Sequence, residues 1–245
     1  MSEALFISDL HLSADDADRV GLFLQFLETR ARSASSVYIL GDLFDAWVGD
    51  DDQRSPIPAI TRALRRLTDS GVELLLMHGN RDFLIGDAFC EATGARLLPD
   101  PCLIDLHGTP TLLMHGDLLC TDDLAYQQFR AQVRAPQMIQ HFLSLPIDQR
   151  FELARQFRQQ SGEANATKAE DIMDVNDEAV RQQIEHYGAA RLIHGHTHRP
   201  AEHRLQVADR EVLRYVLAEW RNDRGEALVV TQQGLKREPV LKTAA

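Results

Sequence analysis

The sequence predicts an α/β protein whose chemistry lies along one edge of a β-sheet. Apolar runs of strand length alternate with amphipathic helical segments, which is the order that builds parallel sheets with right-handed crossovers. Five of the apolar runs end in a polar cluster, and the carboxyl edge of an open α/β sheet is where ligands bind. The clusters are Asp9-Leu10-His11, Gly41-Asp42, Gly79-Asn80-Arg81-Asp82, His115-Gly116-Asp117 and His194-Gly195-His196-Thr197-His198.

The first part of the chain predicts three strands and two helices. The strands are expected at 4–7, 37–40 and 72–77. Apolar residues recur at helical spacing between the first two strands, so we expect an amphipathic helix over 16–32. A second helix is expected over 56–70, because Gly71 stands where a helix C-terminal glycine belongs.

The pattern changes after Leu97. Apolar runs at 102–106 and 111–114 flank His-Gly-Thr-Pro, which predicts a hairpin. Residues 121–187 are almost entirely helical in character, and a further apolar run at 191–193 precedes the last cluster. The segment 203–240 alternates apolar and polar residues, as strands do. Two sheets with helices outside them fit this order.

Length and composition favour one domain. The chain has 245 residues, is 44% hydrophobic and lacks linker-like or repetitive segments, so we expect one domain over 1–245 with an inserted helical cap at about 121–175. Three cysteines without paired spacing favour reduced thiols in a cytoplasm. The chain enters its first strand almost directly and has no apolar run of membrane-spanning length. We therefore expect a soluble or peripheral protein.

Charge distinguishes the insert from the rest of the chain. The formal net charge of −11 disfavours nucleic-acid binding, which depends on Lys and Arg neutralising phosphates. Residues 125–160 carry five arginines against one aspartate and one glutamate, a formal charge of +3, among many apolar side chains. Such an insert can pack its apolar side onto the core, or it can shelter acyl chains and contact an anionic membrane surface.

The polar clusters together form a metal-ligand set. Each cluster alone is explained by an ordinary turn or a buried histidine. Five in this order favour a metal site, and two aspartates, one asparagine and several histidines are enough for two divalent ions. If the first strand continues, Asp9 and His11 point the same way. The glycines at 41, 79, 116 and 195 would let the backbone pass close to the ions and adopt positive φ.

The order of these motifs resembles the calcineurin-like metallophosphoesterase superfamily, over the chain from Asp9 to His198. Three segments are also similar to the branch of that superfamily that hydrolyses UDP-2,3-diacylglucosamine in lipid A biosynthesis of Gram-negative bacteria. They are Gly-Asn-Arg-Asp at 79–82, Gly-Asp-Leu-Phe-Asp-Ala-Trp-Val-Gly-Asp at 41–50 and Ile-Met-Asp-Val-Asn at 172–176. The resemblance implies a four-layer α-β-β-α sandwich with a helical lid insertion and sites at the strand ends between the sheets.

The resemblance also implies a dinuclear centre bridged by Asp42. One ion would be held by Asp9, His11, Asp42 and His198, and the other by Asp42, Asn80, His115 and His196. Nitrogen and oxygen ligands without Cys suit Mn²⁺, Fe or Zn²⁺ better than Ca²⁺, and the resemblance implies Mn²⁺. The implied catalytic residues are Asn80, Arg81 and His196. The implied substrate contacts are Asn80, Arg81, Asp123, Ser161, Asn165, Lys168 and His196.

Neighbouring polar residues are expected in supporting positions. His194, Asp82 and Asp117 are interpreted as groups that orient the ligands or support the structure. The acidic residues Asp45, Asp50, Asp51 and Asp52 are expected in a solvated loop near the mouth of the site. Tyr126 is placed in the same cleft.

Arg81 bears on the type of reaction. Many members of the superfamily carry His at this position, where it can protonate a departing alkoxide or aryloxide. Arg cannot act as that acid because its guanidinium stays charged, but it can hold a second phosphate bidentately. Arg81 therefore suits a leaving group that is already good, such as a phosphate monoester released from a pyrophosphate. The alternative is an arginine paired with Asp82 or another nearby carboxylate.

These points combine into one predicted reaction. A metal-bound hydroxide attacks the α-phosphorus of UDP-2,3-diacylglucosamine and gives UMP and 2,3-diacylglucosamine 1-phosphate. The expected partners are this lipid-linked UDP-sugar and the cytoplasmic face of the inner membrane, with no nucleic acid and no obligate protein partner.

Three alternatives stay open. A soluble nucleotide pyrophosphatase, or another calcineurin-like phosphodiesterase, would act on nucleotides without lipid. A non-catalytic scaffold has no reason to keep a complete ligand set. A nuclease would shift nucleic-acid strands in a gel.

Overall fold

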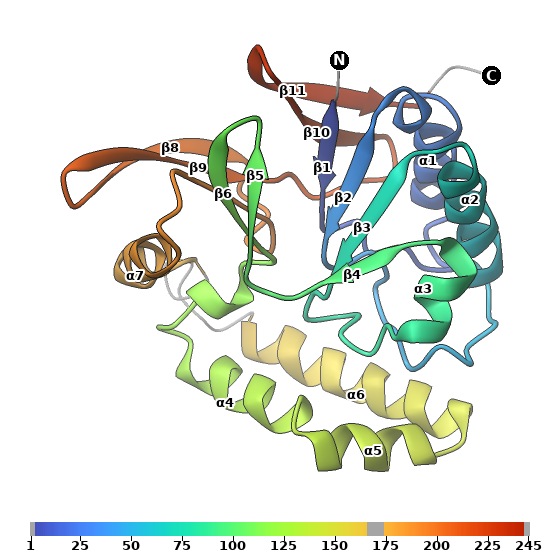
Figure 1. Cartoon of the computed structure of the whole chain (residues 1–245). Helices are drawn as coiled ribbons and strands as arrows, with labels where there is room; N and C mark the ends of the chain where they lie inside the picture. The colour runs from blue at the N-terminus through green and yellow to red at the C-terminus, as the bar shows by residue number, and fades with distance from the viewer. Residues whose placement is uncertain (1–2, 166–173, 243–245) are drawn as a thin grey trace.

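Two β-sheets lie face to face with helices outside them in the computed structural model, which describes residues 3–165 and 174–242, without the side chains of 160–165 (Figure 1). The first sheet has the strand order β11-β10-β1-β2-β3-β4. Its strands are β1 (Ala4–Ile7), β2 (Ser36–Leu40), β3 (Glu73–Met77), β4 (Arg96–Leu98), β10 (Arg224–Thr231) and β11 (Gly234–Leu241). Strands β1 to β4 pair in parallel, so their carboxyl ends meet at one edge.

The second sheet has the order β5-β6-β7-β9-β8. Its strands are β5 (Cys102–Leu106), β6 (Thr109–Met114), β7 (Arg191–His194), β8 (Ala201–Val207) and β9 (Arg210–Val216). Strands β6, β7 and β9 are parallel, while β5–β6 and β8–β9 are antiparallel hairpins. The hairpin predicted around His107-Gly108 is confirmed.

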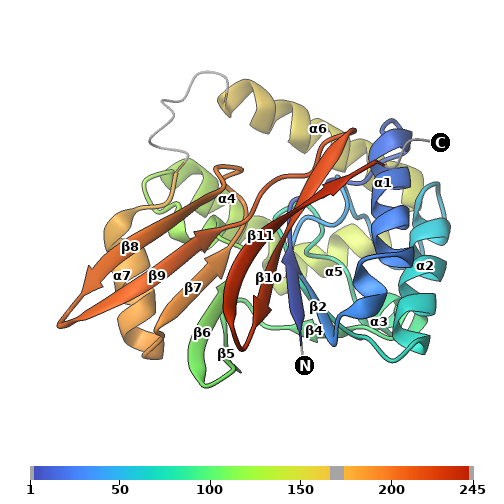
Figure 2. The same ribbon diagram turned by 90° about the horizontal axis from the view of Figure 1, so that it is seen from above.

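Alternation along β1 shows how the layers are built, because successive side chains of a strand point to opposite faces. Leu5 and Ile7 pack into the cluster that contains the buried faces of α1 (Ala17–Glu28) and α2 (Ile57–Asp69). Phe6 faces the other way, into a cluster with residues of the second sheet such as Ile193. Strand β1 is therefore buried on both faces, and α1, α2 and α3 (Asp87–Thr93) lie outside the first sheet (Figure 2).

The outer face of the second sheet is covered by α7 (Asp177–Tyr187). Val180 and Ile184 of α7 are fully buried against Leu112 and Met114 of β6. The four layers, helix, sheet, sheet and helix, agree with the predicted α-β-β-α sandwich. None of the described helices combines the length and the apolar character needed to cross a bilayer.

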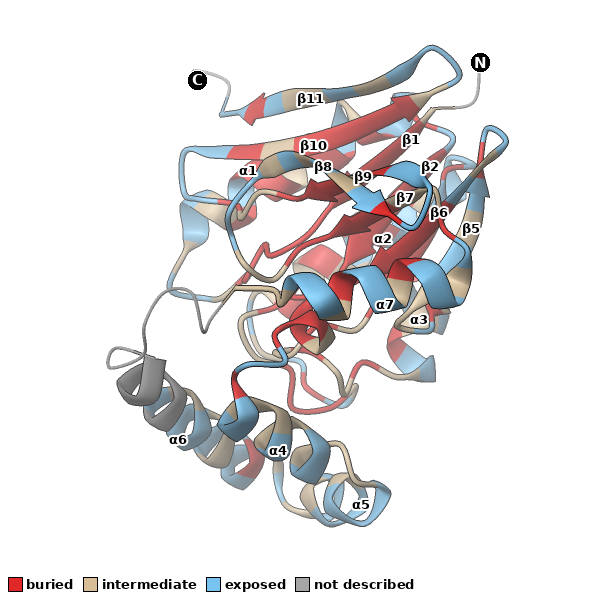
Figure 3. Cartoon of the chain, turned by 90° about the vertical axis from the view of Figure 1, so that its left-hand side faces the viewer, coloured by how far each residue is buried: buried red, intermediate tan, exposed pale blue. Residues whose placement is uncertain are grey.

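Three further helices, α4 (Leu124–Val133), α5 (Pro136–Ser144) and α6 (Ile147–Asn165), lie beyond the carboxyl edge of the first sheet (Figure 1). Among their described side chains only that of Arg150 is buried (Figure 3). Large apolar side chains stay exposed on these helices, and they are Leu124, Met138, Leu143, Phe151 and Phe157. A cap that buries its apolar side in the core does not fit this pattern.

Element boundaries differ from the predictions in three places. Helix α1 ends at Glu28 rather than at 32, and a short 3₁₀ turn, Ala31–Ser33, follows it. Helix α3 and strand β4 were not predicted, since seven and three residues are too short to show a period. The described part of 121–187 contains four separate helices.

Candidate metal centre

The seven predicted metal ligands gather where strands of both sheets end. Asp9 follows β1, Asp42 follows β2 and Asn80 follows β3, while His115 follows β6. His196 and His198 follow β7 in the second sheet. Residues as far apart in sequence as 9 and 198 are brought together because the carboxyl ends of these parallel strands share the space between the sheets.

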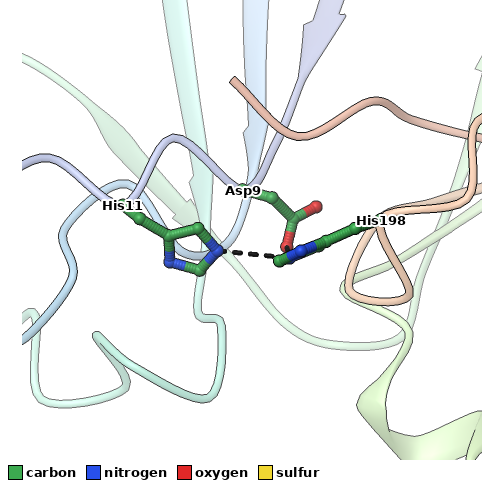
Figure 4. A group of neighbouring side chains, drawn as sticks. All are labelled: Asp9, His11 and His198. Carbon is green, nitrogen blue, oxygen red and sulfur yellow. Dashed lines mark hydrogen bonds and ion pairs between the residues drawn. The ribbon is translucent and has the colours of Figure 1, made fainter. Parts of the chain in front are cut away.

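One group of donors is formed by Asp9, His11 and His198 (Figure 4). The Nε2 atoms of His11 and His198 are 3.2 Å apart, and Nε2 of His198 is 3.3 Å from Oδ1 of Asp9. Asp9 Oδ1 and His11 Nδ1 are buried and form no hydrogen bond among the described residues, although Asp9 Oδ1 faces His198. Buried polar atoms left unpaired in this way are expected where an ion completes the site.

The second group is centred on the amide oxygen of Asn80. Asn80 Oδ1 is 3.0 Å from Nε2 of His115 and 3.0 Å from Nδ1 of His196. Asp42 lies between the two groups, with Oδ2 3.8 Å from Nδ1 of His11 and 3.8 Å from Nε2 of His115. This position is the one that a bridging carboxylate requires. Nitrogen and oxygen donors in two adjoining groups fit divalent metal ions.

The backbone at five of these residues is left-handed. Asp9, His11, Asp42, His196 and His198 have φ angles of 54°, 47°, 54°, 69° and 55°. The condition that the first strand continues through Asp9 and His11 is not met, because β1 ends at Ile7 and both residues follow in a loop. Such conformations cost about 1–3 kcal/mol each and concentrate at functional sites.

The four glycines act in two different ways. Gly41 and Gly116 have φ angles of 88° and 124°, which side-chain-bearing residues rarely adopt. A Cβ at Gly79 would collide with Asp42, and one at Gly195 would collide with Asp9 and Ser8. A Cβ at Gly41 would also lie 2.5 Å from His115 Nδ1, and one at Gly116 would lie 2.9 Å from the Gly195 oxygen. The predicted close approach therefore applies to all four glycines, and the predicted positive φ to Gly41 and Gly116.

Buried carboxylates hold the ligand loops in place. Asp82 accepts hydrogen bonds from the backbone amides of Gly79 and Leu43 at 2.8 and 2.7 Å. Asp42 Oδ1 accepts from the amide of Arg81 at 2.9 Å. The interpretation of Asp82 as a group that orients the ligands fits these contacts. The alternative of an Arg81 side chain paired with a nearby carboxylate is met by Asp45 rather than by Asp82, because the guanidinium lies 3.5 Å from Asp45.

Asp117 connects the loop that carries His115 to helix α4. It is buried and accepts from Tyr126 Oη at 2.8 Å and from Arg130 Nε at 2.7 Å, both on α4. The Tyr126 ring is 6.0 Å from the ring of His196. The placement of Tyr126 beside the cleft fits this contact.

Glu219 is a further group that the sequence analysis missed. Its Oε2 is 3.3 Å from Nδ1 of His198, on the opposite side of the ring from the nitrogen that faces Asp9. A carboxylate on the outer nitrogen of a metal-binding histidine fixes the tautomer and the ring orientation. Glu219 lies outside every motif, so no sequence signal identified it.

Protonation in the metal-free site favours ligand binding by two of the histidines. Burial lowers the pKa of His11 to about 3 and that of His196 to about 4, so both rings are neutral at pH 7. Burial alone would raise the pKa of Asp9, but His198, His115 and His11 hold it below its usual range.

The pKa values of Asp42 and His115 are both raised, for different reasons. Burial raises the pKa of Asp42 to about 7. Burial by itself would lower the pKa of His115. The negative charges of Asp42, Asp117 and Asp9 have a larger effect than burial, and together they raise the pKa of His115 to about 9. His115 therefore keeps a proton at neutral pH until a cation takes its place.

Of the acidic residues predicted in a solvated loop, Asp51 is exposed and Asp45 partly exposed, while Asp50 and Asp52 are bound within the protein. Asp50 accepts from Trp47 Nε1 at 3.1 Å and from the amides of Gly86 and Phe89, which begin α3. Asp52 is buried and pairs with Arg54. The prediction failed for Asp50 because α3 was not predicted, and Asp50 accepts hydrogen bonds from backbone amides at the start of that helix.

The arginines of the helical insert pair with groups of the protein, although Arg155 also stays exposed. Arg150 donates to the Val48 carbonyl at 2.7 Å and pairs with Asp51. Arg134 donates to the carbonyl of Gly79 at 2.8 Å. The other three pairs are Arg130 with Asp117, Arg155 with Glu152, and Arg158 with Asp45. Four of these five arginines, all but Arg155, tie the insert to loops beside the predicted metal ligands.

The predicted substrate contacts fall into two sets. Asn80, Arg81 and His196 adjoin the metal centre, and Asp123 is the buried N-cap of α4, where Oδ1 accepts from the amide of Tyr126 at 3.1 Å. The side chains of Ser161 and Asn165, and Lys168 as a whole, lie outside the described residues.

Comparison with known proteins identifies relatives along most of the chain. Residues 3–200 match the family model described as calcineurin-like phosphoesterase. The chain is 50% identical to the UDP-2,3-diacylglucosamine hydrolase of Marinobacter nauticus over 88% of both chains. It is 49% identical to the UDP-2,3-diacylglucosamine hydrolase of Pseudomonas paraeruginosa, over 96% of this chain and 98% of that protein. Among solved structures, an archaeal phosphodiesterase matches 98% of this chain and 99% of its own, with a TM-score of 0.50 at 10% identity, and so supports the fold.

Proposed function

Because the chain belongs to the calcineurin-like phosphoesterase family, we propose that it hydrolyses the pyrophosphate bond of UDP-2,3-diacylglucosamine in lipid A biosynthesis. The products are UMP and 2,3-diacylglucosamine 1-phosphate. The observation that carries the proposal is the position of Asp42, 3.8 Å from a histidine of each donor group, in a chain about half identical to hydrolases of that name.

Two divalent ions are proposed, and both are proposed to be Mn²⁺. The first would be held by Asp9, His11, Asp42 and His198. The second would be held by Asp42, Asn80, His115 and His196. When bound, such ions activate water for in-line attack, here at the α-phosphorus, and neutralise the charge that develops. Around them the chain's own residues fix the geometry. Asp82 accepts from the Asp42 backbone amide and the Arg81 amide donates to the Asp42 carboxylate, which orients Asp42, and Glu219 orients His198.

Arg81 is proposed to hold the phosphate of the leaving group. Its guanidinium is partly exposed and pairs with Asp45, which also pairs with Arg158 of α6. A phosphate placed here would compete with Asp45 for both arginines. Since an arginine stays charged, it stabilises a leaving phosphate and does not need to protonate it. Asn80 and His196 adjoin the same position and are proposed to contact the transferring phosphoryl group.

Helices α4 to α6 are proposed to form the lid over the acyl chains, as an insertion within one domain over 1–245. The observations that support this are the exposed apolar residues of these helices and the Phe129–Phe157 ring contact between α4 and α6 at 5.6 Å. Asp123, Ser161, Asn165 and Lys168 are proposed contacts to the sugar phosphate. Contact with the inner membrane at its cytoplasmic face would involve the exposed apolar residues, because the described arginines of the insert are paired within the protein.

The position of attack is tested with isotopic oxygen. The Mn²⁺-loaded protein is incubated with UDP-2,3-diacylglucosamine in mixed micelles in ¹⁸O-water, and each product is analysed by mass spectrometry. The proposal predicts the label in the phosphate of UMP. Label in the phosphate of the lipid product would keep the reaction class but contradict attack at the α-phosphorus. Turnover of UDP-sugars without acyl chains at an equal rate would contradict the lipid substrate.

A further inference from the structure

A cavity opens on the α7 side of the second sheet, behind the loop that carries His196 and His198. It encloses about 280 Å³. Strands β8 and β9 form its floor, where His203 pairs in register with Arg214. The lining residues are Asp174, Thr197, Arg199, Pro200, Ala201, His203, Arg214 and Val216. None of them is a predicted metal ligand or substrate contact.

Two side chains of this cavity carry buried polar atoms without partners. Arg214 is only 6% exposed, yet its Nε and Nη1 have no hydrogen-bond partner, and no ion pair involves this guanidinium among the described residues. The hydroxyl Oγ1 of Thr197 is also buried and unpartnered. A buried donor that lacks a hydrogen-bond partner costs about 1–3 kcal/mol of stability, and more when the donor is charged. Both residues line the same hollow, so one bound group can satisfy both.

The charge of the cavity favours an anion. Arg199 lines the same wall, but it is already paired with Asp174 at 2.6 Å. Burial lowers the pKa of His203, which leaves its ring neutral at pH 7. Asp177 lines the adjoining hollow with Arg214 and Asp174 but forms no ion pair with Arg214. Asp174 and Asp177 lie near enough to favour the charged form of Arg214, but neither forms an ion pair with it in the described part of the chain, so its donors stay available to an anion.

We propose that this cavity binds a small oxyanion of the phosphate class, held by the guanidinium of Arg214 and the hydroxyl of Thr197. An arginine and a hydroxyl are common donors to phosphate oxygens. The volume accommodates either inorganic phosphate or a small phosphate monoester. Thr197 lies between His196 and His198, so the occupant touches the loop that supplies two predicted metal ligands. The inference does not depend on the proposed reaction.

Binding is tested by isothermal titration of inorganic phosphate and, separately, of UMP into the Mn²⁺-loaded protein. Arg214→Met is the test variant. Arg204→Met is the matched control, because Arg204 lies on the neighbouring strand β8 and its exposed side chain pairs with Glu211. We expect Arg214→Met to weaken binding of one equivalent of oxyanion by about tenfold or more, since a hydrogen bond from a charged group is lost. Arg204→Met should bind as the unaltered protein does.

Two further measurements keep the inference falsifiable if Arg214→Met folds poorly. Thr197→Val removes the hydroxyl with little change of volume and should weaken binding several-fold. Crystals soaked in tungstate, an anomalously scattering phosphate analogue, should show the anion within hydrogen-bond distance of Arg214. Binding of UMP but not phosphate would identify a monoester site, and the reverse would identify a free-ion site. Wild-type oxyanion binding by Arg214→Met, or tungstate only at the metal centre, would overturn the proposal.

Discussion

Oδ2 of Asp42 lies 3.8 Å from Nε2 of His115, and both side chains are buried. His115 Nδ1 is 2.9 Å from the Leu40 carbonyl oxygen, so that nitrogen is the donor and Nε2 faces the site. In the metal-free protein this pair retains a proton, because the nearby carboxylates raise the pKa of His115. A bound cation would replace that proton, and this exchange leads to the first prediction.

The stability of the metal-free protein should fall as the pH rises from 6.5 to 9. The folded-state pKa of His115 is about 9, above its ordinary value of 6.5, so its contribution is complete below pH 6.5 and is lost as pH rises through 9. Thermal unfolding with EDTA should show this loss. The Mn²⁺-loaded protein should not show it, because the ion replaces the proton. A metal-free protein whose melting temperature is constant or rises over this range would contradict the assignment.

Removing the proposed bridge should affect both ions. Asp42→Ala is expected to lower turnover by about a thousandfold or more and to reduce bound metal below two equivalents, measured by mass spectrometry of the dialysed protein. Circular dichroism should show that the variant still folds. Asp209→Ala, in the exposed turn between β8 and β9, is the control and should keep full activity and metal content. Normal turnover in Asp42→Ala would contradict the two-metal account.

Glu219 should strengthen Mn²⁺ binding at the site that contains His198. Because its carboxylate lies 3.3 Å from His198 Nδ1, Glu219→Ala is expected to weaken Mn²⁺ binding at that site by about 10–100-fold. Glu219→Gln, which keeps an acceptor oxygen, should lose less. Titration calorimetry with Mn²⁺ resolves the weakened site from the unaffected one. Glu211→Ala, on β9, serves as the control, and unchanged Mn²⁺ affinity in Glu219→Ala would show that the contact has no positioning role.

Arg81 should be needed for pyrophosphates rather than for phosphodiesters in general. Arg81→Lys keeps a charge but loses the bidentate fork, and Arg81→Ala loses both. We expect turnover of UDP-2,3-diacylglucosamine to fall by about 10²–10³ in Arg81→Ala and by less in Arg81→Lys. Arg81→His should restore little of it. If Arg81→His cleaves the pyrophosphate normally and gains activity on simple phosphodiesters, the role assigned to Arg81 is wrong.

The sequence predicted which residues gather at the candidate centre better than it predicted what holds them in place. Each ligand follows an apolar run, and the period of a strand is short enough to recognise in four or five residues. The left-handed backbone at Asp9 and His11 was not foreseen, because no local pattern distinguishes it from a continuing strand.

Support from distant residues was also missed. Glu219 reaches His198 from a loop without a motif, and Arg150 is buried against Val48 although arginines of helices are usually exposed. These contacts depend on tertiary packing between segments far apart in the chain, which periodicity and spacing do not encode. The same reason explains why Asp50 was placed in solvent although it accepts hydrogen bonds from Trp47 and from the amides that begin α3.

The most direct test of the central claim is turnover of UDP-2,3-diacylglucosamine by the metal-stripped protein in mixed micelles, with and without added Mn²⁺. The account predicts that UMP and 2,3-diacylglucosamine 1-phosphate form only when the divalent ion is restored, and that Asp42→Ala stays inactive in its presence. Hydrolysis that continues undiminished after complete metal removal, or no hydrolysis with any divalent ion, would contradict a dinuclear pyrophosphatase acting on this lipid.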